Sequence, residues 1–140
     1  MTYAVKQNLI DRFGVTELAQ LTDRVDGETI DDTVVARALE DADGLINGYL
    51  QSRYALPLAS VPATIVAIAC NIARYQLFED HVTEIVRKRY EDAIAWLKDV
   101  AAGKVSLGLD GSGDETETES GTVDFDANDR VFNTTTLADY

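Results

Sequence analysis

The sequence predicts a mainly α-helical protein: a compact bundle of about four to five helices with an extended acidic C-terminal arm. Before Gly103, apolar residues recur at steps of three and four, the period of a helix with one buried face. One helix, about residues 62–79, is apolar on nearly every face, so its own domain or a partner chain must bury it. After Gly103 this periodicity ends, and Gly, Ser, Thr and acidic residues dominate. We therefore place a helical domain at residues 1–104 and the arm at residues 105–140.

The first two helices are expected to be short. Thr2 can cap a helix that runs to Phe13, and Gly14 suits the position just after its end. Thr16 can cap a second helix over Glu17–Leu21. Two short helices therefore precede the main part of the bundle.

A turn at Asp23–Gly27 leads to the first long helix, for which Asp31 and Asp32 are candidate N-caps. Its apolar positions form one stripe: Val34, Val35, Ala38, Leu39, Ala42, Leu45, Ile46, Tyr49 and Leu50. Gly44 and Gly48 interrupt this helix, and each costs about 1 kcal/mol relative to alanine. We expect close packing against a neighbouring helix to account for them.

The apolar helix is predicted to start at Pro62, where a missing N–H costs nothing, and to end near Glu79. The centre of the bundle should then consist of Ile65, Ile68, Ala69 and Ile72. Thr83 can cap the last long helix, and Gly103 can end it.

The charge is strongly acidic, with a net value of −13 and a pI near 4.2. Residues 1–102 hold 16 acidic and 10 basic residues, and residues 103–140 hold nine and two. This balance disfavours broad DNA binding and anionic membranes. We find neither a membrane-length apolar run nor the pattern of a signal peptide. With Cys70 as its single cysteine, the simplest interpretation is a soluble intracellular protein in a reducing compartment.

The acidic run after residue 109 only partly matches a calcium loop. Asp110, Ser112 and Asp114 fall at loop positions one, three and five. Glu115, however, stands where glycine is required, and Gly121 stands where the bidentate glutamate should be. A solvated linker is the favoured interpretation.

No set of residues in the sequence indicates catalysis. His81 has neither a nucleophile nor an orienting partner in a recognisable motif and is expected on a surface loop. Cys70 is expected to act as a small buried hydrophobe, and Asp31 and Asp32 as helix caps. The one basic cluster, residues 87–89, is interpreted as a solvated helix face. We expect no catalytic residue, cofactor or metal, and hence no enzyme.

The arm is predicted to dock on another protein surface. Asp110–Gly121 holds no apolar side chain and cannot fold alone, so we interpret it as a tether. The expected anchors are Val131, Phe132, Leu137 and Tyr140. The alternative is that the arm folds back on its own bundle.

Several segments, in order, resemble the Mu-type phage head–tail connector family, also called head-completion or adaptor proteins. They are Asp11-Arg-Phe-Gly14, Leu21-Thr-Asp-Arg24, Ala42-Asp-Gly-Leu-Ile-Asn-Gly-Tyr-Leu50, Arg53-Tyr-Ala-Leu-Pro-Leu58, Ala69-Cys-Asn-Ile-Ala-Arg-Tyr75, Arg89-Tyr90 with Ala93-Ile94 and Leu97, and Gly103-Lys104. Asp129-Arg-Val-Phe132 also looks like the family's C-terminal segment, whereas Leu109–Ser120 departs from the pattern.

This resemblance implies a structural virion protein, found at the neck and assembled in the host cytoplasm. Such proteins form a ring, usually dodecameric, beneath the portal at the capsid vertex. The implied partners are other copies, the portal protein, and a tail-side connector or tail terminator protein. The ring forms part of the DNA channel, through which DNA passes without specific binding. No cofactor or membrane is implied.

Two other hypotheses remain open. The second is a small acidic helical protein-binding or regulatory module, for which a folded monomer with one soluble partner is expected. A hydrolase that uses His81 with an acidic residue is the third possibility, and it requires a turnover that His81→Ala removes.

Overall fold

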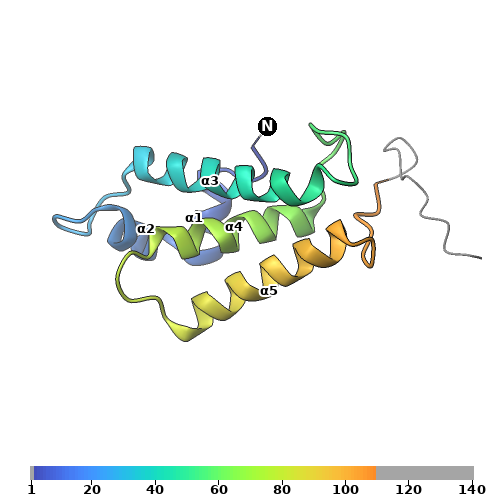
Figure 1. Cartoon of the computed structure of the whole chain (residues 1–140). Helices are drawn as coiled ribbons and strands as arrows, with labels where there is room; N and C mark the ends of the chain where they lie inside the picture. Colours follow the sequence, from blue (N-terminus) through green and yellow to red (C-terminus); the bar gives the residue numbers. More distant parts are fainter. Residues whose placement is uncertain (1, 110–140) are drawn as a thin grey trace, which may run out of the picture.

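The computed structural model describes residues 2–109, which form five α-helices (Figure 1). The helices are α1 Lys6–Phe13, α2 Val15–Thr22, α3 Asp32–Leu50, α4 Ala63–Leu77 and α5 Glu84–Ala101. No strand occurs among the described residues. The predicted mainly α fold class is confirmed, while the division into a domain and an arm at residue 104 stays a prediction.

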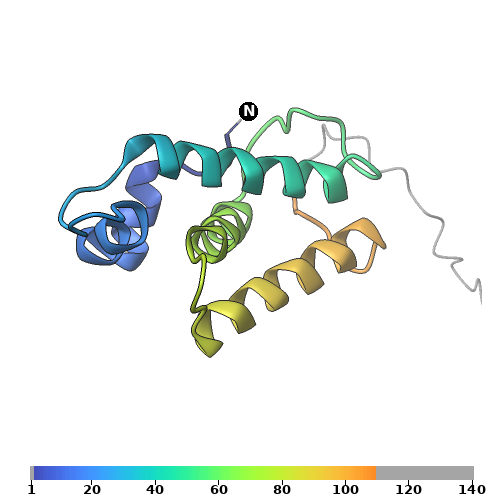
Figure 2. The same ribbon diagram turned by 60° about the vertical axis from the view of Figure 1, so that its left-hand side comes forward.

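The helix α4 lies at the centre of the bundle. It packs against α3 and α5, and also against α1. Figure 2 looks nearly along α4, with α3 above it and with the α1–α2 pair and α5 on opposite sides. Two long helices and one short helix therefore surround the most apolar helix of the chain.

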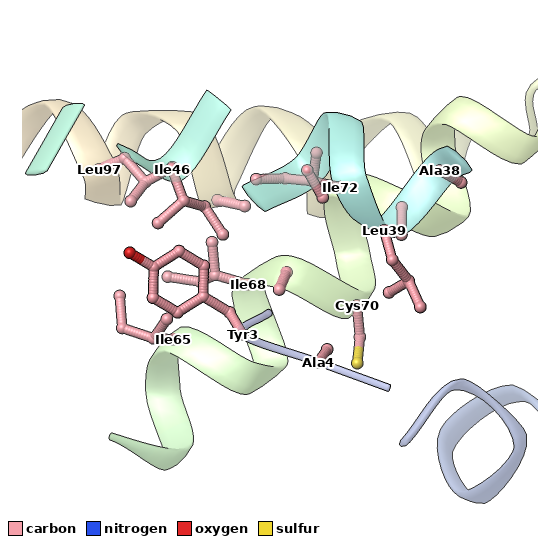
Figure 3. Close-up of a cluster of buried hydrophobic side chains, with 14 of the residues drawn as sticks. Tyr3, Ala4, Ala38, Leu39, Ile46, Ile65, Ile68, Cys70, Ile72 and Leu97 are labelled. Carbon is pink, nitrogen blue, oxygen red and sulfur yellow. The ribbon is translucent and has the colours of Figure 1, made fainter. Parts of the chain in front are cut away.

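The residues predicted for the centre of the bundle do lie there. Ile65, Ala69 and Ile72 have no exposed surface, and Ile68 is 6% exposed. Figure 3 shows the three isoleucines within the cluster of buried side chains. Each buried isoleucine stabilises the fold by about 1.5–3 kcal/mol relative to an exposed one. Cys70 belongs to the same cluster, which agrees with its predicted role as a small hydrophobe.

The starts of the two short helices differ from the prediction. The helix α1 begins at Lys6, because the Tyr3 N–H donates to Asp43 on α3 and the preceding residues are not helical. Val5 is its N-cap, and the Asn8 side chain accepts the Val5 N–H. Thr2 is therefore not the cap. Likewise α2 begins directly after Gly14, before Thr16, because Gly14 itself stands at the cap position.

The termini of the long helices follow the sequence signals. The Asp31 carboxylate accepts the N–H groups of Thr33 and Val34, and the Thr83 hydroxyl accepts the Val86 N–H. Gly103, at φ +80°, ends α5 in a Schellman turn. Any Cβ at Gly103 would also lie 3.1 Å from the Arg53 guanidinium. Both the positive φ and this close contact therefore favour glycine at the position.

The explanation expected for Gly44 and Gly48 is wrong. Both glycines lie on an exposed face of α3, and a Cβ added at either would meet nothing within 4 Å. No described helix packs against them.

The packed chain continues past residue 104. Leu107 is buried in the core, and its N–H donates to the Tyr54 hydroxyl at 3.1 Å. Val105 and Leu109 are half-buried against the same cluster. Apolar side chains of residues 105–109, a stretch that we expected in the arm, therefore contact the core of the bundle.

Candidate protein interface

A groove opens between α1 and α5, with α4 between them, and is called the α1–α5 groove below. Its volume is about 490 Å³. It is lined by Arg12, Phe13, Thr64, Ile68, Asn71, Arg89, Asp92, Ala93 and Trp96. Figure 2 shows the two flanking helices on either side of α4. The lining combines aromatic, apolar and cationic groups, a composition suited to a protein partner.

Two arginines give the α1–α5 groove a positive balance. Arg12 comes from the last turn of α1 and Arg89 from α5, and both are exposed. Neither forms an ion pair with another described residue. Asp92 is the only acidic residue in the described lining. Burial raises the pKa of the adjacent Cys70 thiol, an effect that Arg12 partly offsets, so this cysteine is not an activated nucleophile.

The α1 side of the groove is held by a half-buried cation. The Arg74 guanidinium of α4 lies 4.3 Å from the centroid of the Phe13 ring and 2.5 Å from the Glu17 carboxylate. Arg74 and Glu17 are only 15% and 29% exposed, so water screens their attraction less than at an open surface. These contacts fix α1 and α2 against α4 and keep the Phe13 ring at the edge of the groove.

The α5 side continues the groove along one helix face. Ile85, Arg89, Asp92 and Trp96 are spaced by four, three and four residues, which places them in one row. Ile85 is 65% exposed, and Trp96 is half-buried. The row therefore extends the lining from the Trp96 ring to an exposed apolar side chain.

A second exposed contact point lies on the loop between α2 and α3. The Asp23 carboxylate accepts four backbone N–H groups, those of Val25, Asp26, Glu28 and Thr29. These hydrogen bonds lower the pKa of Asp23 to about 2. Val25 is 89% exposed on this ordered loop. The Asp23 network thus holds an apolar side chain out in water.

The N-terminal segment is tied to α3 by polar contacts. The Tyr3 N–H donates to Asp43 at 2.9 Å, and the Tyr3 hydroxyl bonds to the Asn47 side chain. Burial raises the pKa of Asp43, although the bond from Tyr3 opposes this shift. Beside this segment, Ala4, Val35 and Leu39 line a shallow apolar depression of about 320 Å³. These contacts stabilise the fold, and their arrangement does not indicate a catalytic or ligand-binding site.

The candidate catalytic residues do not come together. His81 is exposed in the loop before α5 and bonds to no other described residue. Asp31 caps α3, while Asp32 pairs with Lys6 at 2.5 Å. Within residues 2–109, no three His, Cys, Asp or Glu side chains are placed to hold a metal ion. None of the five helices is both long and apolar enough to cross a bilayer.

The predicted arm anchors Val131, Phe132, Leu137 and Tyr140 lie outside the described residues, as does the partial calcium pattern that starts at Asp110. Their roles stay predictions.

The sequence pattern alone did not indicate the α1–α5 groove. The cluster at residues 87–89 was interpreted as a solvated face, yet Arg89 lines the groove. The available signal was the row of Ile85, Arg89, Asp92 and Trp96, where apolar and charged residues share one face. Phe13 and Arg12 could not be added to it without knowing where α1 packs.

Sequence comparisons show the family to which this helical protein belongs. Residues 3–125 match the family described as "Bacteriophage Mu, Gp36", so the chain belongs to this Mu-type phage family. It is 40% identical over 121 residues to the Mu-like prophage FluMu protein gp36 of Haemophilus influenzae, covering 86% of both chains. It is 38% identical over 112 residues to gene product J of Escherichia phage Mu, covering 79% of both chains. The predicted membership of a Mu-type phage family is confirmed.

Proposed function

We propose that this phage protein is a head–tail connector, a head-completion or adaptor protein that forms a ring beneath the portal and lines the DNA channel. The observation that carries this proposal is the match over residues 3–125 to a Mu phage family. It covers the segments whose resemblance implied a connector, including Leu21–Arg24 and Arg53–Leu58. The role is structural and involves no catalysis.

The surface of the bundle supports a role in assembly. The α1–α5 groove joins the Phe13 and Trp96 rings to exposed Ile85, and the Asp23 loop presents Val25. Single exposed apolar residues are common on monomers, but a groove with aromatic walls and a charged rim has the composition of a protein interface. A ring protomer needs at least two such surfaces, since a head-to-tail contact joins two different patches.

The charge supports a channel through which DNA slides. Residues 1–109 hold 16 acidic and 11 basic residues, a net of −5, and residues 110–140 hold nine and one, a net of −8. Acidic walls repel phosphate, whereas a lysine-rich wall would retain it. We propose that part of this acidic surface lines the channel.

The test is attachment to the matching portal. Purified full-length protein and portal should form a complex whose mass, measured by mass photometry, exceeds that of the portal by many copies of the 15.3 kDa chain. The Phe132→Ala and Tyr140→Ala variants should weaken this attachment, because aromatic anchors carry much of an interface's binding energy. A monomer that does not bind the portal and instead binds one soluble partner would overturn the proposal and favour the regulatory module.

A further inference from the structure

We propose that the α1–α5 groove receives the acidic C-terminal segment, residues 110–140, of a neighbouring copy of the chain. The inference rests on the proposed ring, which brings a neighbour next to each groove. It assigns the predicted anchors a specific receptor within the protein itself.

Charge favours this occupant. Residues 110–140 contain nine acidic residues and one basic residue, Arg130. The groove presents Arg12 and Arg89, neither of which is neutralised by another described residue. Arginine binds carboxylates through paired N–H groups, and such charge-assisted hydrogen bonds are stronger than neutral ones. The most acidic part of the chain thus complements the positive groove.

The apolar groups also match. The groove supplies the Phe13 and Trp96 rings with Ile68 between them, and the α5 row adds exposed Ile85. The segment supplies Val131, Phe132, Leu137 and Tyr140, which follow eight of its nine acidic residues. An occupant with both aromatic and acidic side chains can fill the pocket and pair the arginines together.

The exit of the chain favours the groove of a neighbour. Leu107 is anchored to Tyr54, and Arg53 donates to the Val100 carbonyl at 3.2 Å, so residues 103–109 lie against the C-terminal end of α3. Figure 2 shows this stretch rising from α5 toward α3, away from the side where α1 and α5 flank α4. A segment of 31 residues can extend up to roughly 100 Å, enough to reach an adjacent protomer. Such a contact is head-to-tail, the type of interface that forms a ring when the rotation between successive copies closes.

The experiment crosslinks full-length protein in which half the chains carry 15N. The R89K variant places an amine in the groove, and a carbodiimide joins amines to nearby carboxylates. Wild-type protein is the control for background coupling of the neighbouring Lys88. We expect crosslinked peptides that join position 89 to acids in residues 110–140 and combine labelled with unlabelled chains. Crosslinks found only within one chain, or only to other regions, would overturn the inference.

A charge-reversal pair supplies the second readout. Changing both Arg12→Glu and Arg89→Glu should raise the protein concentration needed for assembly on the order of tenfold or more. The matched control changes both Arg37→Glu and Arg87→Glu, two exposed arginines outside the groove lining, and should leave assembly unchanged. Asp124→Arg and Asp129→Arg should partly restore assembly of the groove variant. Equal effects of the groove and control variants, at unchanged melting temperatures, would overturn the inference.

Different results would contradict the connector function and the proposal that the groove receives a neighbour's C-terminal segment. Rings that bind the portal without groove crosslinks would contradict this inference and leave the connector function intact. Crosslinks between chains that never form rings would support the groove and contradict the connector.

Discussion

Two adjacent rows of α4 differ in how the chain covers them. The row of Ile65, Ala69 and Ile72 is fully buried. The row one residue earlier lines the α1–α5 groove and combines buried Ile68 with exposed Thr64 and half-buried Asn71. Both rows have the same spacing, and only the second contains polar side chains. The apolar composition of a helix therefore predicts that the helix is buried. It does not show how much of the helix surface the monomer itself covers. The remaining face is the one we assign to a neighbour.

The largest expected effect separates these two rows. Ile72→Ala should lower the free energy of unfolding by about 2–5 kcal/mol, because it leaves a cavity in a closed core. Ile68→Ala should cost clearly less in the free protein, since Ile68 borders the open groove. Urea unfolding of both variants tests this. Equal losses would mean that the second row is as well packed as the first.

Truncation tests where the bundle ends. A chain that stops at Lys104 loses Leu107 and should lose about 1.5–3 kcal/mol of stability, the value of one buried leucine. A chain that stops at Leu109 should keep its melting temperature and lose attachment to the portal. The comparison is made by calorimetry and portal binding. If stopping at Leu109 destabilises the bundle while attachment survives, the C-terminal segment serves the monomer's own core.

On the exposed face of α3, in contrast, substitutions are expected to stabilise the protein. Gly44→Ala and Gly48→Ala should each stabilise the protein by about 1 kcal/mol, since alanine favours a helix and meets no neighbour. Thermal unfolding of the single and double variants measures this gain. A loss of stability would reveal a covering contact on α3 that the monomer does not show.

A smaller effect concerns the Asp23 loop. The pKa of Asp23 is lowered from 3.8 to about 2, so its contribution to stability is full above pH 3.8 and is lost as pH falls toward 2. Asp23→Asn should therefore be less stable than wild type at pH 7, with the gap closing below pH 3.8. Denaturant unfolding across this range checks the slope. A gap that is independent of pH would show that the charge of Asp23 is not what orders the loop.

The smallest expected signal is with DNA. At physiological salt, a gel-shift assay with duplex DNA should show no binding at micromolar protein, because acidic residues outnumber basic ones by 25 to 12. A submicromolar affinity would contradict the acidic channel.

The sequence predicted local features better than packed ones. Asp31, Thr83 and Gly103 were identifiable as helix caps because capping depends on residues close in sequence. The buried centre of α4 followed from its apolar composition. The groove did not, because it depends on where Arg12 and Phe13 of α1 lie relative to Arg89 and Trp96 of α5. The start of α1 was missed for the same reason, since Tyr3 bonds to Asp43, 40 residues away.

Cryo-electron microscopy of the full-length protein bound to its portal tests the proposed ring and its contacts together. We expect a closed ring beneath the portal, with acidic surface toward the channel and density in each α1–α5 groove that traces to the C-terminal segment of the adjacent protomer. Portal particles that carry no ring after incubation with excess protein would contradict the connector function.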